Sequence, residues 1–439
     1  MRRALLSLCV ALTAACGGRA HASLLAPAGV RAALRPFADS LLADSMFRSA
    51  NWGVLIVDPA AGDTLYSRNA GKLFMPASNQ KLLTGATALT QLGPDFRFTT
   101  RFATNGAQQD GTLDGDLIVI GRGDPTFSDS MRAGDYRNAF REMADSLVAR
   151  GIHRIHGSLR RGGDAFPDSS YGFGWQVDDL NTPSGAVIGE LFVNEGLLPG
   201  KRVRANGDTV DAMLVIHDPA AAFLGALAAA LAERRIAIDG SVDSKTPLAD
   251  AGLTPLFELR SVPLAAIVAR MAKPSQNQIA EILFKTLALE KTGVGTADSG
   301  RRVVERQLTA WGALPDGFAV RDGSGMSRHD YVTPETIVRI LEAMRTGRDF
   351  TVWYDALPIA GVDGTIAARM KGTPAQTSVH AKTGTLDKTR SLSGYVTTAD
   401  GRMLEFSFLC NNFSTPTREV DRVQDAILVL VASGRIGSR

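Results

Sequence analysis

The amino-acid sequence predicts a mixed α/β (α+β) protein with more than one domain, on three observations. The chain has 439 residues, which is too long for a single hydrophobic core and implies two or three domains. Hydrophobic residues make up 45% of it and charged residues 21%, as in an ordinary folded soluble protein. Apolar runs of strand length alternate with amphipathic stretches of helical period, so both kinds of secondary structure are expected.

The first 22 residues predict an export signal. Arg2-Arg3 forms a basic start, and the apolar run Ala4 to Ala15 that follows is too short to span a bilayer. Two processing sites compete: the A-x-A site Ala20-His21-Ala22, and a bacterial lipoprotein box that makes Cys16 the lipidated residue. A lipid anchor on Cys16 is the only membrane association that we expect.

Cysteine usage and charge narrow the class of protein further. Two of the three cysteines lie in the export signal, so no internal disulfide framework is expected. The third, Cys410, lies in an apolar run of strand length, where we expect a packed core thiol. The net charge is +3 with basic and acidic residues interspersed, which predicts no nucleic-acid partner.

The first part of the mature chain predicts a hairpin followed by a helix. Residues 23–35 are rich in alanine and form either a linker or a first helix. Residues 52–57 and 64–66 have the pattern of strands, and the Asp, Pro and Gly residues between them predict a connecting turn. The helix that follows carries Ser78 near its start and ends at Gly93-Pro94.

The pattern changes near residue 96 and again near residue 255. The middle segment is expected to contain strands, two helices and a loop-like stretch at 175–195, and the last segment is expected to mix helices with strands. Helices are predicted at 136–150, 219–235, 263–271, around 279–287 and at 419–432, and extended segments at 96–103, 117–120, 152–160, 210–216, 236–238, 379–383, 394–397 and 404–411.

Ser78 and Lys81 form the only S-x-x-K in the chain. At the start of a helix, residues three apart share one face, so the lysine amine comes within reach of the serine hydroxyl. Serine needs a neighbouring base to become a nucleophile, and lysine acts as that base only when its pKa is lowered. The spacing also arises by chance, so the hypothesis of a catalytic pair depends on partners elsewhere in the chain.

Two kinds of triplet offer such partners. Of the S-x-N triplets that start at Ser49, Ser67 and Ser275, only Ser275-Gln276-Asn277 lies between two helices, where a loop can direct both side chains into a cleft; a helix cap is the alternative. Of the two K-T-G triplets, Lys291-Thr292-Gly293 has the pattern of a helix end. Lys382-Thr383-Gly384 lies on a predicted strand, where glycine permits close approach to the backbone, and it is our choice.

The order S-x-x-K, S-x-N, H-x-K-T-G-T resembles that of the penicillin-recognising serine enzymes. The gap of nearly two hundred residues between Lys81 and Ser275 is similar to that of the D-alanyl-D-alanine carboxypeptidase/endopeptidases, the class C low-molecular-mass penicillin-binding proteins. Gln276 departs from the Asp that related enzymes often carry at this variable middle position. Further similar stretches are Gly121 to Pro125, Trp175 to Leu180, Val193 to Glu195, Asp322 to Arg328 and Leu357 to Thr365.

The resemblance implies a penicillin-binding/β-lactamase-like transpeptidase domain, with a five-stranded antiparallel sheet and flanking helices. The expected division is a signal at 1–22, a discontinuous DD-peptidase domain at 23–94 and 262–439, and an inserted accessory region at 95–261. The implied function is a serine-type D-Ala-D-Ala carboxypeptidase or DD-endopeptidase of the bacterial periplasm or cell envelope. It acts on peptidoglycan stem peptides ending in D-Ala-D-Ala, and β-lactams acylate and inhibit it.

The resemblance also implies catalytic roles for three residues. Ser78 attacks the carbonyl of the penultimate D-alanine, Lys81 is the base for acylation, and Ser275 relays a proton to the leaving D-alanine. The backbone N–H groups of Ser78 and Thr385 form the oxyanion hole.

Substrate binding is expected of a second set of residues. Asn277 is expected to bind the peptide backbone. Lys382 is expected to attract the terminal carboxylate and to lower the pKa of Lys81. Thr383 and Thr385 are expected to hydrogen-bond the substrate, with Gly384 between them.

Other sites and functions are weighed against this hypothesis. Ser324 in Asp322-Gly323-Ser324-Gly325 lacks the first glycine of a G-x-S-x-G nucleophile motif, so we expect a tight-turn residue beside the site. The chain has no H-E-x-x-H and no nucleotide-binding glycine motif, so neither a metal nor a cofactor is expected. Two alternatives stay open: a β-lactamase or esterase of the same superfamily, and a non-catalytic cell-wall-binding protein.

Overall fold

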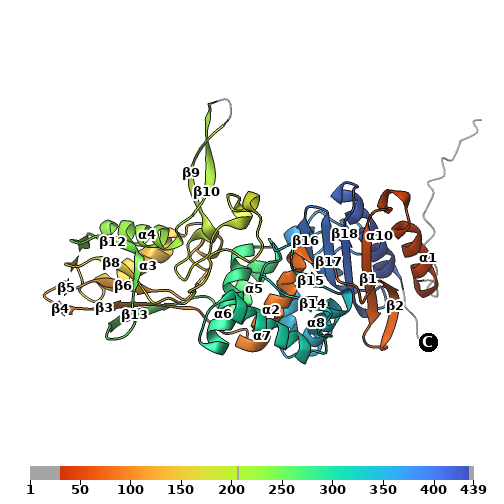
Figure 1. Ribbon diagram of the computed structural model, residues 1–439, viewed down its shortest axis with the longest axis horizontal. Helices are drawn as coiled ribbons and strands as arrows, with labels where there is room; N and C mark the ends of the chain where they lie inside the picture. Colours follow the sequence, from red (N-terminus) through yellow and green to blue (C-terminus); the bar gives the residue numbers. More distant parts are fainter. Residues whose placement is uncertain (1–29, 205–206, 435–439) are drawn as a thin grey trace, which may run out of the picture.

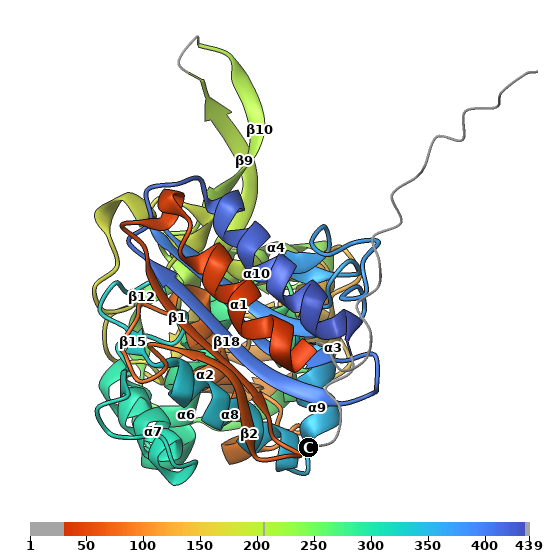
Figure 2. The same cartoon turned by 90° about the vertical axis from the view of Figure 1, so that its right-hand side faces the viewer.

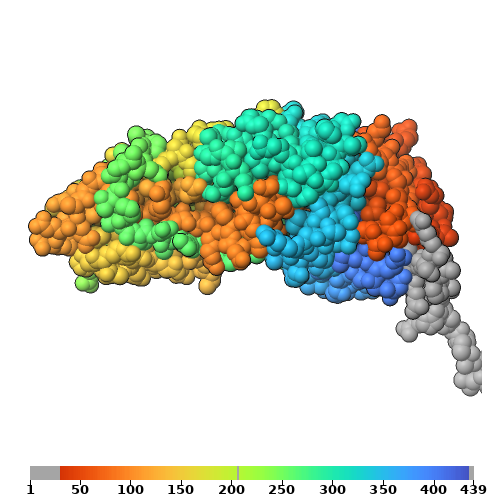
Figure 3. Space-filling view, turned by 90° about the horizontal axis from the view of Figure 1, so that it is seen from below, coloured from red at the N-terminus to blue at the C-terminus, as the bar shows by residue number. Residues whose placement is uncertain are grey.

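The computed structural model describes residues 30–204 and 207–434, so the predicted export signal and Cys16 lie outside the described residues (Figure 1). The molecule is elongated, with the helix nearest the N-terminus at one end and residues from the middle of the chain at the other (Figures 1 and 3). Within the described ranges, no helix is long and apolar enough to cross a membrane.

A five-stranded antiparallel sheet joins the two ends of the chain, in the order β16-β17-β18-β1-β2. This confirms the predicted sheet. The predicted hairpin supplies β1 and β2, and the C-terminal segment supplies the other three strands. The bounds are β1 (Asn51–Asp58), β2 (Asp63–Arg68), β16 (Val379–Leu386), β17 (Thr389–Thr397) and β18 (Met403–Asn411).

Helices cover both faces of this sheet. On one face lie α1 (Val30–Leu42) and α10 (Thr417–Ser433), which pack against each other (Figure 2). Cys410 is buried in the core of this layer as a free thiol, as predicted. On the other face lies a helical layer that contains α2 (Gln80–Leu92).

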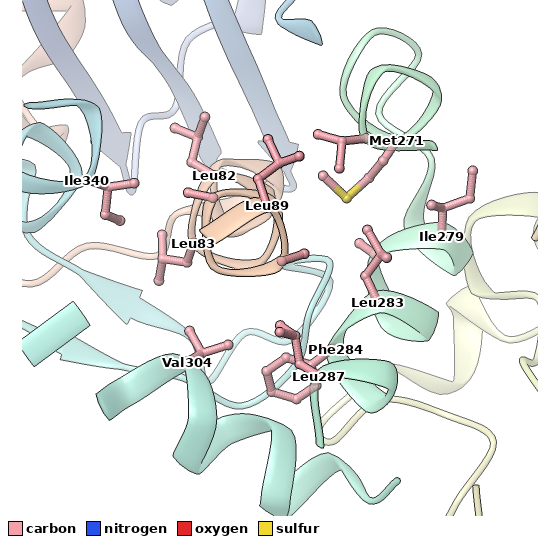
Figure 4. Packing of buried hydrophobic residues seen from close by; sticks show 14 of the residues in the cluster. Leu82, Leu83, Leu89, Met271, Ile279, Leu283, Phe284, Leu287, Val304 and Ile340 are labelled. Atoms are coloured by element: carbon pink, nitrogen blue, oxygen red, sulfur yellow. The ribbon is translucent and has the colours of Figure 1, made fainter. Parts of the chain in front are cut away.

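Helix α2 is the centre of the helical layer. All its residues from Gln80 to Leu89 are buried, although a helix at a protein surface normally buries one stripe. Figure 4 shows Leu82, Leu83 and Leu89 surrounded by side chains from several helices. The surrounding helices are α5 (Leu264–Ala272), α6 (Asn277–Thr292), α7 (Ala297–Ala310), α8 (Pro334–Thr346) and α9 (Phe350–Ala356).

The middle of the chain forms a separate layered region with its own hydrophobic core. Its entering strand β3 pairs antiparallel with its leaving strand β13, with Thr99 opposite Arg260, so the segment departs and returns at one place. Two sheets have the orders β12-β8-β6-β3-β13 and β11-β7-β5-β4, and two helices, α3 and α4, pack on them. The bounds are β3 (Thr99–Thr104), β4 (Ala107–Gln109), β5 (Thr112–Asp114), β6 (Leu117–Ile120), α3 (Arg137–Val148), β7 (Arg154–Ile155), β8 (Leu159–Gly162), α4 (Pro219–Glu233), β11 (Ala237–Ile238), β12 (Val242–Leu248) and β13 (Thr254–Arg260).

A hairpin of β9 (Leu197–Val203) and β10 (Thr209–Val215) projects from this region (Figures 1 and 2). A small pair, β14 (Phe318–Ala319) and β15 (Tyr331–Val332), lies beside the helical layer.

Several elements depart from the sequence-based expectations. Strands β9, β12 and β13 and helices α7 to α9 were not predicted. Of β12 and β13, only Phe257 is buried, and neither strand has a regular apolar alternation. The expected extended segment 152–160 divides into β7 and β8, because the chain passes from one sheet to the other there. Ser78 lies in a 3₁₀ turn, Ala77–Asn79, that precedes α2 instead of in the helix itself.

The packing around α2 generates a stability prediction. Leu283 of α6 is completely buried in this core, so Leu283→Ala removes buried methyl groups and leaves a cavity. We expect the free energy of unfolding, measured by urea denaturation, to fall by about 2–5 kcal/mol. Leu314 is 63% exposed, so the matched change Leu314→Ala is expected to alter it by less than about 0.5 kcal/mol. Equal losses in the two variants contradict the central position of Leu283.

Candidate active site

Side chains of the central sheet hold the segment that carries Ser78. Asn411 of β18 accepts a hydrogen bond from the Met75 N–H at 2.8 Å and donates one to the Met75 carbonyl at 3.2 Å. Ser391 of β17 donates to the Pro76 carbonyl at 2.7 Å, and Asn79 donates to Ser393 Oγ at 2.7 Å. The turn is thereby fixed on the sheet.

The backbone at the start of this turn is strained. Ala77 has a φ of 48°, a left-handed conformation that is uncommon for a residue with a Cβ. Such strain persists only when the surrounding structure imposes it. Here it leaves Ser78 half-buried and facing a cleft.

The amine of Lys81 has three hydrogen-bond partners. Its Nζ lies 2.8 Å from Ser78 Oγ, 2.6 Å from Asn277 Oδ1 and 2.8 Å from the Ser324 carbonyl. An amide oxygen and a carbonyl oxygen only accept, and a neutral amine has two N–H groups and one lone pair. When Lys81 is neutral, both N–H groups are taken by Asn277 and Ser324, so the lone pair is directed at the Ser78 hydroxyl.

Burial lowers the pKa of Lys81 to about 7, although the carboxyl groups of Asp322 and Glu281 raise it. Burial, followed by the charge of Asp322, in turn raises the pKa of Glu281 to about 8, so this group is mostly protonated at neutral pH. Desolvation of Lys81 outweighs the two carboxyl groups, so its neutral form is well populated near pH 7. The cause is desolvation, whereas the sequence-based expectation had assigned it to Lys382.

Ser324 lies in a tight turn beside Lys81, as predicted. Its N–H donates to Glu281 Oε1 at 2.8 Å, and the next residue, Gly325, has a φ of 83°. Asp322 holds the turn from inside, because it accepts from the Gly325 N–H at 2.6 Å and from the Trp175 indole at 2.9 Å.

The Ser275 loop contains an unexpected cap. The side chain of Gln276, the variable middle residue of the motif, accepts from the Gln278 N–H at 2.7 Å and caps α6. The cap therefore comes from Gln276, which leaves Ser275 and Asn277 free to face the cleft. Ser275 itself has a φ of 68°, so the loop is strained.

Strand β16 brings the second lysine to the site. Lys382 Nζ donates to Ser275 Oγ at 2.8 Å and to the Thr383 carbonyl at 2.9 Å, and the side chain is completely buried. Burial, followed by the positive charge of Lys81, lowers the pKa of Lys382 well below its usual range. Two buried amines this close together repel each other when both are protonated, so the charged form of each is disfavoured.

Gly384 has to be glycine for a visible reason. A Cβ at this position would lie 2.5 Å from the Pro76 carbonyl oxygen and 2.8 Å from the Ser78 nitrogen. Both are backbone atoms of the turn that the sheet holds, so they cannot move aside cheaply. The strand thus passes directly beside Ser78, and the backbone that approaches Gly384 is that of the turn.

The middle of the chain reaches the same site, which the sequence analysis did not predict. Asn277 Nδ2 donates to the Ser184 carbonyl at 3.0 Å, and Gln278 donates to the carbonyls of Pro183, Ser184 and Ala186. Glu195 accepts two hydrogen bonds from Arg270 of α5, at 2.7 and 2.8 Å. The similar stretch Val193 to Glu195 was the one signal in the sequence for this contact.

These residues surround an open cleft of about 440 Å³. The predicted residues Ser78, Ser275, Asn277, Thr383, Gly384 and Thr385 all line it, together with Ser184, Pro274, Thr365 and Arg390. Lys81 and Lys382 are buried behind its wall. No sequence motif contains Arg390. It reaches the cleft because it lies on β17, the strand that pairs with β16, directly opposite Thr385.

The rejected triplets have other surroundings. Lys291 is exposed in the last turn of α6, and Gly293 caps that helix with a φ of 78°. Ser49 is exposed, and Ser67 lies on β2 at the far edge of the sheet from β16. His380 stacks on Tyr354 with ring centroids 3.8 Å apart, so it packs beside the site.

A family model described as the D-Ala-D-Ala carboxypeptidase 3 (S13) family matches residues 35–215 and 202–433. The chain belongs to this family. A D-alanyl-D-alanine carboxypeptidase of Actinomadura sp. (strain R39) is 32% identical to it over 464 residues, which cover 91% of this chain and 84% of that protein. The D-alanyl-D-alanine carboxypeptidase DacB of Haemophilus influenzae is 28% identical over 433 residues, covering 85% and 88%.

Solved structures agree on the fold. The crystal structure of penicillin binding protein 4 (dacB) from Haemophilus influenzae superposes with a TM-score of 0.76 at 23% identity, covering 90% of this chain and 98% of that one. The same protein complexed with a β-lactam gives a TM-score of 0.70 at 24% identity, with the same coverage. Family membership decides among the three functions that the sequence left open, in favour of a serine-type carboxypeptidase/endopeptidase.

Proposed function

We propose that this S13 enzyme cleaves D-Ala-D-Ala peptides of peptidoglycan through an acyl-enzyme on Ser78. The observation that carries the proposal is the environment of Lys81. Its amine lies 2.8 Å from Ser78 Oγ, and its other two partners are acceptors that take both N–H groups of the neutral amine. Lys81 is then the base that removes the Ser78 proton, with no histidine in the pair.

The first step forms a bond between Ser78 Oγ and the carbonyl carbon of the penultimate D-alanine. The hydroxyl proton passes to the lone pair of Lys81, and the carbonyl oxygen becomes an oxyanion. We assign its stabilisation to the N–H groups of Ser78 and Thr385, which flank the point where Gly384 approaches the turn. A donor of this kind typically contributes about 2.7–4 kcal/mol to the transition state.

In the second step the C–N bond breaks and the amine of the terminal D-alanine leaves. It needs a proton, and we assign the delivery to Ser275, whose hydroxyl oxygen accepts a hydrogen bond from Lys382 at 2.8 Å. The proton that Lys81 took from Ser78 replaces the one that Ser275 gives up, so both lysines end the step as they began it. Asn277 keeps one side of its amide on Lys81 and the other on Ser184, which supports its role beside the substrate backbone. Water then releases the acyl group.

The same nucleophile is proposed to react with β-lactams, whose strained amide takes the place of the peptide bond. A β-lactam complex of a protein with this fold supports the proposal. Thr383 and Thr385 are assigned to hydrogen-bond the substrate along β16.

We further propose that the protein works in the bacterial periplasm or cell envelope. A bacterial relative named as a D-alanyl-D-alanine carboxypeptidase supports this location. Export uses the segment 1–22, and a lipid anchor on Cys16 is the finer alternative to cleavage after Ala22. Mass spectrometry of the mature N-terminus distinguishes the two.

We also propose a division of the chain into two structural parts. Residues 23–94 and 262–439 form one discontinuous DD-peptidase domain, and residues 95–261 form an inserted accessory region. The separate hydrophobic core of the middle segment supports this division. Two transitions in calorimetry of the full chain are its expected signature.

Acylation at Ser78 is tested by incubation of the mature protein with a fluorescent penicillin, followed by a denaturing gel. We expect a covalent label on the wild type and none on Ser78→Ala, because the bond forms at Oγ. Ser49→Ala, which removes an exposed serine of a rejected triplet, is expected to keep the label. An unlabelled wild type, or undiminished label on Ser78→Ala, refutes the proposal.

The pH dependence of acylation follows from Lys81. Only the neutral amine accepts the Ser78 proton, so the second-order rate of acylation by penicillin is expected to rise with pH, with a midpoint of about 7. Asn277→Asp places a carboxylate on the amine and favours the ammonium form, so the midpoint is expected to move up by about 1–3 pH units. Asn51→Asp, at an exposed position, serves as the control. A rate that falls through pH 7 identifies a different base.

A further inference from the structure

Among the described residues that line the cleft, Arg390 is the one with a permanently charged cationic side chain. It lies on β17 directly opposite Thr385 of β16, and its Nη1 contacts Thr385 Oγ1. None of the three sequence motifs includes it.

The guanidinium is held in a fixed orientation. Asp421 of α10 accepts from its Nε at 2.6 Å and from its Nη2 at 3.0 Å. The side chain is 12% exposed, and Arg369 also contacts Asp421, at 3.0 Å. A two-point contact with a carboxylate fixes the plane of the guanidinium, so Nη1 remains directed at Thr385 and the cleft.

Lys382 is poorly suited to hold a substrate carboxylate on its own. It is completely buried, and its amine already donates to Ser275 and to the Thr383 carbonyl. Burial, then Lys81 and then Arg390, lower its pKa. Arginine keeps its charge throughout the working pH range, and its planar N–H groups match a carboxylate in geometry.

We propose that Arg390, together with the hydroxyl of Thr385, binds the C-terminal carboxylate of the substrate and selects for peptides that carry one. The assignment rests on the proposed function and deepens it. Lys382 then serves the Ser275 hydroxyl, and the carboxylate is held one residue farther along β16. Arg390 touches the substrate without taking part in proton transfer, so it determines specificity.

The test compares two peptides that end in D-Ala-D-Ala and differ only in a free C-terminal carboxylate or a C-terminal amide. For the wild type we expect kcat/KM to favour the free acid. In Arg390→Gln we expect kcat/KM for the free acid to fall by about 10- to 100-fold, the usual effect of losing a hydrogen bond to a charged group. The value for the amide is expected to change little, so the preference disappears.

Three further variants separate recognition from folding. Arg390→Lys retains a charge without the planar geometry, so part of the preference is expected to survive. Asp421→Asn weakens the support of Arg390 and is expected to reduce the preference as well. Arg418 lies on the same helix as Asp421 and is 75% exposed, so Arg418→Gln is expected to leave kcat/KM for both peptides unchanged.

The outcomes are distinguishable. An Arg390→Gln enzyme that keeps the wild-type preference for the free acid overturns the assignment. So does an Arg390→Gln enzyme whose kcat/KM falls equally for both peptides. A wild type that cleaves neither peptide and takes no penicillin label on Ser78 refutes the proposed function itself. A labelled wild type with an intact preference in Arg390→Gln refutes only the role of Arg390.

Discussion

The structure depends on the burial of a lysine amine next to a serine hydroxyl. Water at this position would hydrate the ammonium of Lys81 and keep its pKa near the ordinary value. The protein removes that water by burying α2 on every side, and it supplies two acceptors, Asn277 and Ser324, in place of solvent. Packing of α2 against the surrounding helices offsets the cost of this burial.

Each acceptor is positioned by a different part of the chain. Ser324 belongs to a turn that Asp322 organises, and Asp322 is in turn bonded to Trp175 from the middle segment. Asn277 is bonded to Ser184, also from the middle segment. The middle segment therefore supports both acceptors of the Lys81 amine, through one contact to each, although none of its own side chains belongs to the predicted motifs.

Lys382 is buried close to Lys81, and this proximity affects the charge of both amines. Lys81 and Lys382 share a dry site, so a charge on one disfavours a charge on the other. Each amine contacts one serine hydroxyl: Lys81 contacts Ser78, and Lys382 contacts Ser275. A guanidinium for substrate recognition fits better in the cleft wall, where Arg390 is held against Asp421.

The sequence alone determined the elements and the motifs that depend on local chemistry. The S-x-x-K pair, the choice of Ser275 and Lys382 over their decoys, the five-stranded sheet and the buried Cys410 all followed from spacing, local pattern and resemblance. Tertiary structure alone decided that Gln276 caps α6, that Gly384 touches the turn of Ser78, and that Ser184 and Arg390 line the cleft. These contacts join residues far apart in the chain or on neighbouring strands. No local period or motif encodes such distances, because they are set only when the sheet pairs and the middle segment packs against α6.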